Sequence, residues 1–183
     1  TIEIMAACTF NNCKNLESVN YPKNLREIYA VNSSPNNYEF EFYTPFYGCS
    51  SLKSITIPEG VTNIPRYVFR NMSGLETVNF SSTVKTIDKL AFAGSGIKNV
   101  VLPDSVTSIG EHAFGNCYSL ESAYLGEDLT TIGEYAFNNC SKLAAIEIPA
   151  GVTLLGKYMF ENCSSLAEVT LHDGLKAIHA YVF

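Results

Sequence analysis

The sequence predicts a repeat solenoid of α/β class, with parallel strands on one side and short helical turns on the other. Three observations support this prediction: a period of about 23 residues, four apolar columns in register with it, and an alternating segment in every copy. The period is marked at intervals of 22 or 23 residues by Phe46, Phe69, Phe92, Phe114, Phe137, Phe160 and Phe183. One such unit cannot bury its own apolar face, whereas stacked units form a continuous core.

Each copy begins with a predicted strand, because the motif L-x-x-I-x-I ends in alternating apolar and polar residues. Leu143, Ile146 and Ile148 are the apolar positions of one such copy. Proline follows this motif at Pro22, Pro58, Pro103 and Pro149. Proline has no backbone N–H, so it ends the strand's ladder of hydrogen bonds. A second inward-facing pair comes next, as in Val106 and Ile109.

The predicted helical turn lies between this second pair and the phenylalanine. Its first position holds glycine in three copies, but Pro65, Asp88 or His179 in others. Proline at this position excludes an obligatory positive φ, and Gly, Asp and Pro are all common at helix starts. The following x-x-A-F segment is therefore expected to form one turn of 3₁₀- or α-helix that directs the phenylalanine inward.

The length favours a single domain over residues 1–183, made of one repeat array. Residues 1–13 form a partial rung, residues 14–28 a strand and turn, and residues 49–183 regular rungs. The rung that starts at Ser95 is one residue short, so a tightened turn is expected there. Because the sequence opens and closes inside a repeat, it is expected to be an excerpt of a longer chain.

An insertion at about residues 29–45 interrupts the period, since Phe10 and Phe46 are 36 residues apart. Tyr38, Phe40 and Phe42 alternate with acidic residues within it, which predicts an extra strand or a hairpin arm. Insertions in repeat proteins often carry binding residues. The alternative is a hairpin whose aromatic side chains only cover a weak rung.

The unit C-x-x-L-x-x-I-x-I-P-x-x-V-T-x-I-G-x-x-A-F-x-x-C resembles the bacterial surface-antigen (BspA-like) class of leucine-rich repeat, over essentially residues 1–183. Departures are Met72 and Ser95 in the cysteine column, the deletion near Gly96, and the insertion. The resemblance implies a right-handed leucine-rich repeat solenoid, located outside the cell or in the cell envelope and used in adhesion or recognition. It supplies no catalytic residues.

The charge distribution bears on the class of partner. The net charge of −6 disfavours nucleic-acid binding through phosphate neutralisation. Residues 1–100 carry a net +1 (9 basic, 8 acidic) and residues 101–183 a net −7 (3 basic, 10 acidic). This acidity is either a solubilising surface or a field that attracts a cationic partner. The apolar runs are too short to insert into a membrane.

Five cysteines share one repeat column: Cys13, Cys49, Cys117, Cys140 and Cys163. Neighbours in a stack would lie about 5 Å apart, which permits a disulfide. Equivalent side chains point the same way, however, so buried free thiols are predicted and disulfides are the alternative. Cys8 lies outside the column and is the candidate reactive thiol.

No catalytic, cofactor-binding or metal-binding residues are predicted. His112, His172 and His179 occupy different repeat positions, and none is brought to a serine or cysteine. One cysteine per rung does not offer the four convergent ligands of a zinc site. Enzymatic activity is therefore disfavoured, because no set of columns assembles a nucleophile, a base and an orienting group.

The outward-facing strand positions form the predicted partner-binding surface. Tyr124 beside Val101 is its aromatic–apolar pair and a candidate anchor. The candidate residues are Lys53, Thr56, Glu76, Asn79, Lys98, Val101, Glu121, Tyr124 and Glu147, with Tyr38, Phe40 and Phe42 of the insertion.

These features predict a non-enzymatic recognition or adhesion module of a secreted or cell-surface bacterial protein. Its partner would be a protein or glycoprotein, with host extracellular-matrix proteins as candidates. The alternative is a structural spacer that presents other domains. Exposed terminal rungs could also pair end to end between molecules.

Overall fold

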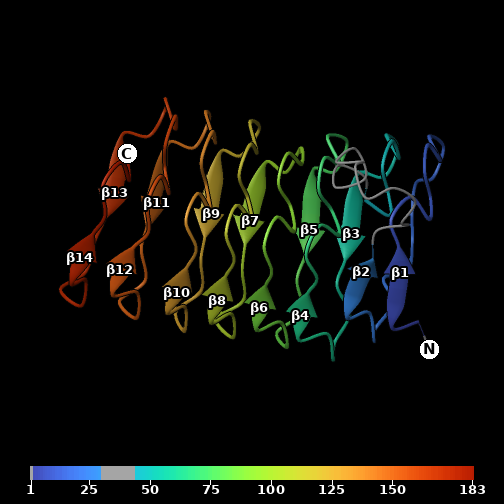
Figure 1. Ribbon diagram of the computed structural model, residues 1–183, viewed down its shortest axis with the longest axis horizontal. Helices are drawn as coiled ribbons and strands as arrows, with labels where there is room; N and C mark the ends of the chain where they lie inside the picture. The colour runs from blue at the N-terminus through green and yellow to red at the C-terminus, as the bar shows by residue number, and fades with distance from the viewer. Residues whose placement is uncertain (1, 30–43) are drawn as a thin grey trace, which may run out of the picture.

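The computed structural model describes residues 2–29 and 44–183, which wind into a solenoid with one rung for each sequence repeat. Two columns of short strands run side by side along its long axis, and the two ends of the chain lie at opposite ends of the stack (Figure 1). Every paired strand is parallel to its neighbour. A membrane-spanning helix is not found among the described residues.

The first column contains three-residue strands whose outward side chains form what we call the strand face. These are β3 (Ser54–Thr56), β5 (Thr77–Asn79), β7 (Asn99–Val101), β9 (Ser122–Tyr124), β11 (Ala145–Glu147) and β13 (Glu168–Thr170). The second column contains two-residue strands. These are β4 (Asn63–Ile64), β6 (Thr86–Ile87), β8 (Ser108–Ile109), β10 (Thr131–Ile132), β12 (Leu154–Leu155) and β14 (Ala177–Ile178). Near the N-terminus, β1 (Ile4–Ala6) pairs with β2 (Glu27–Tyr29).

The strand register follows the sequence repeat, because equivalent positions pair with each other. Ile55 pairs with Val78, and Ile146 pairs with Val169. In β3, β5, β7 and β11 the middle residue is buried and the two flanking residues are exposed. A slip of one residue would turn every buried side chain towards solvent, so burial of the middle position determines the register. The predicted strand in each copy from β3 onward is confirmed.

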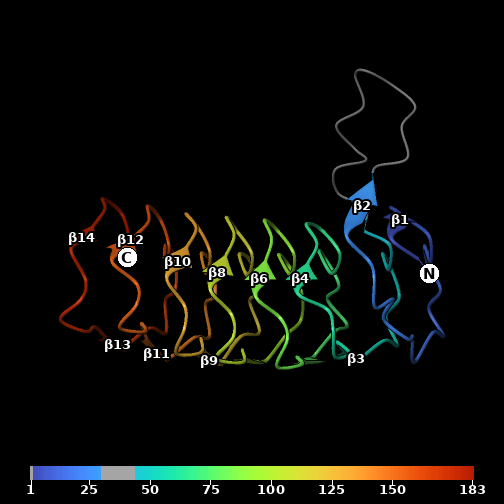
Figure 2. The same cartoon turned by 90° about the horizontal axis from the view of Figure 1, so that it is seen from below.

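A ladder of stacked phenylalanine rings fills the core. Ring centroids are 5.2 Å apart for Phe92 and Phe114, 5.4 Å for Phe114 and Phe137, and 5.9 Å for Phe137 and Phe160. All of these side chains are buried. Figure 2, turned by 90°, shows the successive rungs along which this ladder runs. The prediction that the phenylalanine column points inward is confirmed.

The predicted helical turns are wrong: no helix is present in residues 2–29 and 44–183, so the described fold is all-β rather than α/β. Tyr135 and Asn139 have φ values of 58° and 59°, and such left-handed residues interrupt a right-handed helix. The N–H groups of Phe114 and Asn116 donate to carbonyls of the next rung, at 2.9 and 2.7 Å. Hydrogen bonds between rungs thus alternate with local turn bonds, such as that from Gly115 N–H to the His112 carbonyl oxygen, and no continuous helical pattern forms.

The irregular rungs interrupt the strand columns. The first column is divided into a β3–β5 pair and a four-stranded β7–β13 sheet, and the break coincides with the one-residue deletion. A Cβ at Gly96 would collide with the carbonyl oxygen of Ser73, so the backbones of these two rungs approach closely at the deletion. No strand is formed by residues 18–20, contrary to expectation, and β3 pairs with β5 alone among the described strands. The predicted strand or hairpin arm of the insertion lies outside the described residues.

Candidate functional site

The strand face brings the outward residues of successive rungs into rows. Thr56 pairs with Asn79, and Val101 pairs with Tyr124. Side-chain hydrogen bonds link some neighbours, as where the Ser122 hydroxyl donates to Asn99 Oδ1 at 2.6 Å. The face is therefore a continuous strip whose composition changes along the stack.

The N-terminal half of the strip carries a row of alternating charges. The ammonium group of Lys53 lies 3.7 Å from a carboxylate oxygen of Glu76, and Lys98 hydrogen-bonds the other oxygen. The hydrogen bond from Lys98 and its positive charge lower the pKa of the Glu76 carboxyl. These predicted residues are thus brought together, and the Glu76 carboxylate compensates one of the two ammonium charges. A shallow hollow of about 400 Å³ lies beside the row.

The C-terminal half of the strip contains a hollow of about 420 Å³ that we call the acidic hollow. Its walls include Tyr124, Gly126, Glu127, Glu147, Pro149 and His172. The hollow forms at a change in the repeat, because Gly126 occupies the column that holds Pro103 and Pro149 in the adjacent rungs. Gly126 has φ of +76°, and a Cβ there would meet the carbonyl oxygen of Pro103 at 2.5 Å. The backbone of Gly126 therefore lies directly against that of Pro103, where a residue with a side chain would not fit.

Polar contacts hold the walls of the acidic hollow in place. The Tyr124 hydroxyl donates to Asp104 Oδ1 at 3.0 Å, and the backbone N–H of Glu127 donates to the same oxygen at 3.2 Å. This hydrogen bond, and then burial and the negative charges nearby, raise the pKa of Tyr124. On the far wall, His172 Nε2 lies 2.9 Å from Glu147 Oε1. Asp104 therefore positions both the aromatic ring and the adjoining turn.

The described candidate residues all lie on this strip. Tyr124 and Val101 remain 49% and 65% exposed, so both side chains of the predicted anchor pair reach solvent. Tyr124 and Glu147 line one hollow, whereas Lys53, Glu76 and Lys98 form the ion row. Tyr38, Phe40 and Phe42 lie outside the described residues.

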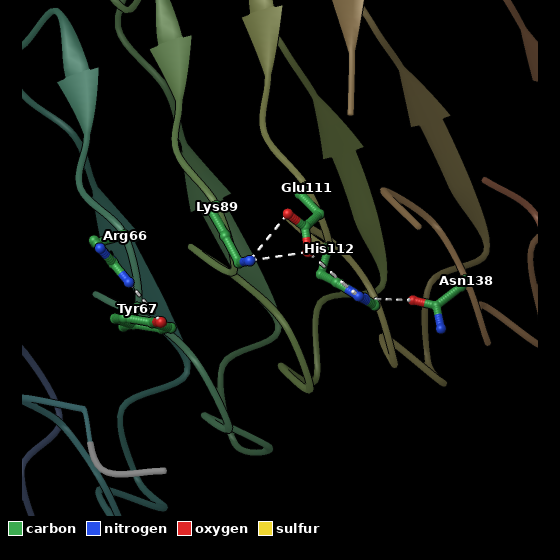
Figure 3. Close-up of polar contacts among 6 residues, drawn as sticks. All are labelled: Arg66, Tyr67, Lys89, Glu111, His112 and Asn138. Carbon is green, nitrogen blue, oxygen red and sulfur yellow. Dashed lines mark hydrogen bonds and ion pairs between the residues drawn. The ribbon is translucent and has the colours of Figure 1, made fainter. Parts of the chain in front are cut away.

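A second ordered surface, missed by the sequence reasoning, lies on the turn side of the rungs. His112, Tyr135, Tyr158 and Tyr181 stack in series with centroids 4.5, 4.7 and 5.3 Å apart. Around its start, Lys89 contacts Glu111 at 2.9 Å and His112 Nδ1 lies 3.2 Å from Asn138 Oδ1 (Figure 3). The available signal was the tyrosine or histidine two residues before five of the repeat phenylalanines, four of them in consecutive rungs.

The cysteine column is made of free thiols in the structure, with burial that varies along the stack. Cys49, Cys117 and Cys140 are buried as predicted, but Cys13 is exposed and Cys163 is only half-buried. Cys13 and Cys163 lie in rungs near the two ends of the stack, where fewer neighbours cover them. Burial raises the pKa of the half-buried Cys8 thiol, which argues against the predicted reactivity because the thiolate is the nucleophile.

The described residues contain no group of three or more His, Cys, Asp or Glu side chains that could hold a metal ion. The histidines stay apart: His112 belongs to the aromatic stack and His172 to the acidic hollow. What the strand face offers is an extended, partly charged surface that includes the exposed ring of Tyr124.

Sequence comparison identifies the family. The model of the BspA-type leucine-rich repeat region matches residues 1–117 and 85–183, in six copies. This chain belongs to the BspA-type leucine-rich repeat family. Its members are repeat proteins, and the match indicates no catalytic family. No curated protein sequence matches the chain.

Solved structures of bacterial proteins share the fold of this chain. A leucine-rich repeat protein from T. pallidum has a TM-score of 0.69 and 30% identity, over 73% of this chain and 63% of that one. The pneumococcal vaccine antigen PcpA has a TM-score of 0.62 and 29% identity, over 67% of this chain and 31% of that one. A leucine-rich repeat protein from Eubacterium ventriosum, 21% identical with a TM-score of 0.56, shares the fold over 98% of this chain and 57% of that one. The chain thus spans less than two thirds of the length of each.

Proposed function

We propose that this chain is a non-enzymatic recognition or adhesion module of a secreted or cell-surface bacterial protein, and that its strand face binds a protein or glycoprotein. The single observation that carries the proposal is the exposed Val101–Tyr124 pair on an ordered strip of outward side chains. Exposed aromatic side chains at the centre of a surface are typical binding hot spots. Similarity to a protein described as a vaccine antigen supports the surface location.

The test is a surface plasmon resonance screen of the purified chain against host extracellular-matrix and plasma glycoproteins. Tyr124→Ala should weaken saturable binding by tenfold or more, since loss of a hot spot costs about 2 kcal/mol or more. Tyr118→Ala is the matched control, because Tyr118 is a 59% exposed tyrosine that lies outside the strands of the strand face. A deletion of residues 31–43 examines the insertion separately. Equal binding by Tyr124→Ala and the control would contradict the assignment of the strand face.

The second candidate function is a structural spacer. It is favoured by the continuous core, in which stacked phenylalanine rings join each rung to the next. A spacer predicts no partner and tolerance of every surface substitution. A folded sample that binds nothing across the panel would favour this candidate.

A further inference from the structure

The acidic hollow combines an apolar floor with charged walls. Its floor and rim include Leu125, Pro149 and Ala150, and the Tyr124 ring forms one side. Its volume of about 420 Å³ falls at the lower end of the range of pockets that take small molecules, roughly 300–1,000 Å³. The hollow can therefore receive one long side chain, with its methylene groups against the apolar floor.

The electrostatic character of the acidic hollow is negative. Glu127 and Glu147 line it, and the Asp104 carboxylate lies behind the Tyr124 hydroxyl. His172 is the one basic group among the described lining residues, and it already faces Glu147. The pKa of Tyr124 is raised first by its hydrogen bond to Asp104 and then by burial, and the negative charges of Asp104, Glu127 and Glu147 raise it further. An anionic ligand would be repelled, whereas a cation would be attracted and held.

The Tyr124 ring is an independent feature that also favours a cation. A phenol that donates a hydrogen bond to a carboxylate becomes more electron-rich, which strengthens the attraction of its ring face for a cation. The bond to Asp104 supplies this donation and fixes the orientation of the ring. Because the ring is half exposed, one part of it remains open to a partner.

We propose that the acidic hollow is a socket for a lysine or arginine side chain of a protein partner. The aliphatic stem of that side chain packs on Pro149 and Ala150, and its cationic head lies between Glu127 and Glu147 beside the Tyr124 ring. Long basic side chains suit a hollow with an apolar floor and acidic walls, because they combine an apolar stem with a charged end. This inference rests on the proposed recognition function and assigns the chemistry of the partner.

The test is an NMR titration of the ¹⁵N-labelled chain with a serine–glycine nonapeptide that has one central arginine. The matched probe carries citrulline, which is similar in shape but neutral, at the same position. With peptide raised to about 10 mM, tenfold above a Kd of 1 mM, the arginine peptide should give saturable shifts at the amides of Gly126, Glu127 and Glu147. The citrulline peptide should bind at least fivefold more weakly. Equal shifts with both peptides, or none at these amides, would overturn the socket.

Variants distinguish specific binding in the acidic hollow from general attraction to the negatively charged surface. Glu127→Gln combined with Glu147→Gln should weaken binding of the arginine peptide at least tenfold. Glu168→Gln removes one charge from the strand face outside the hollow and should change binding less than twofold. If all variants lose affinity in proportion to their charge, the socket is wrong. These exposed side chains leave the core intact, and a thermal melt of each variant verifies folding.

The titration also distinguishes this inference from the proposed function. A glycoprotein that binds through Tyr124 but is unaffected by the Glu127/Glu147 variant, together with no response to the arginine peptide, overturns the socket and leaves recognition standing. A response to the arginine peptide with no glycoprotein bound supports the socket while contradicting the proposed class of partner.

Discussion

Four cysteines of the column, Cys49, Cys117, Cys140 and Cys163, act as hydrogen-bond donors between rungs. Cys117 Sγ donates to the carbonyl oxygen of Phe92 at 3.3 Å, and Cys140 Sγ donates to that of Phe114 at 3.2 Å. A small side chain with one donor suits this position, which explains why Ser95 can replace cysteine in another rung. The column thus stabilises the stack through unbridged thiols.

Replacing Cys117 should change how stability depends on pH. Burial raises the pKa of Cys117 to about 11, above the ordinary value of 9.0. In the unfolded chain the thiol ionises near pH 9 while the folded thiol stays protonated, so its contribution is present below pH 9 and is lost as pH rises towards 11. Two pKa units correspond to about 2.7 kcal/mol of free energy of unfolding.

Urea denaturation of the wild type and Cys117→Ser at about pH 8 and about pH 11 measures this effect. Serine does not ionise in this range and keeps a donor for Phe92, so the variant should lose less stability than the wild type on going to high pH. Parallel losses in the two proteins would show that Cys117 is not the buried titrating group.

At the scale of the element, bonds and contacts between rungs stabilise the turns. Asn139 Nδ2 donates to Asn116 Oδ1 at 2.8 Å, and Asn162 Nδ2 donates to Asn139 Oδ1 at 2.9 Å. All three asparagines have positive φ, a conformation that asparagine tolerates better than most residues. The turn segments therefore form a ladder of their own, parallel to the phenylalanine stack.

Phe137→Ala should lower the free energy of unfolding by about 3–5 kcal/mol. The ring lies between Phe114 and Phe160, so its removal leaves a cavity bounded by two rungs that cannot close together without breaking their hydrogen bonds. Chemical denaturation measures the loss. The exposed Tyr118→Ala serves as the control and should stay within about 0.5 kcal/mol. A loss as small as that of the control would contradict the role of the phenylalanine ladder.

For the whole molecule, stability is a sum of rungs and of contacts between neighbouring rungs. The β7–β13 sheet is continuous, whereas the deletion separates it from β3–β5. Burial also changes along the stack: Leu143 and Ile146 are buried, but Leu171 and Ile178 of the last rung are 41% and 49% exposed. The free energy of local unfolding should therefore be higher for the middle rungs than for the C-terminal rung of this 183-residue chain.

Native-state hydrogen exchange should show slower amide exchange in β9 and β11 than in β13 and β14. The central strands have a rung on each side, and opening them requires loss of two interfaces, whereas the last rung has one. Exchange rates are measured by NMR at two pH values. Rates that rise with pH as the intrinsic exchange rate does show that they report opening equilibria and not opening rates. Uniform protection from β9 to β14 would instead indicate that the whole stack opens as one cooperative unit.

Much of the fold was predictable because one structural unit is repeated. The alternation in Leu143, Ile146 and Ile148 predicted a strand with one buried face. The phenylalanine period predicted that the rungs stack with this side chain in the core. The same alternation assigned Tyr124 and Val101 to the outer face. The helical turn was mispredicted because a local pattern such as Y-A-F does not reveal that its N–H groups bond to the next rung.

The sequence by itself determined the repeat, the strand register and the identity of the outward residues, because these depend on side-chain periodicity within one unit. Tertiary structure alone decided the turn conformation, the tyrosine stack and the acidic hollow. Each of these requires contact between residues about one period apart, such as Tyr124 and Asp104, which are 20 residues apart. The local sequence of Gly126 marks only a missing proline, and the hollow exists because stacking places Gly126 beside Pro149, Glu147 and His172 of the following rungs.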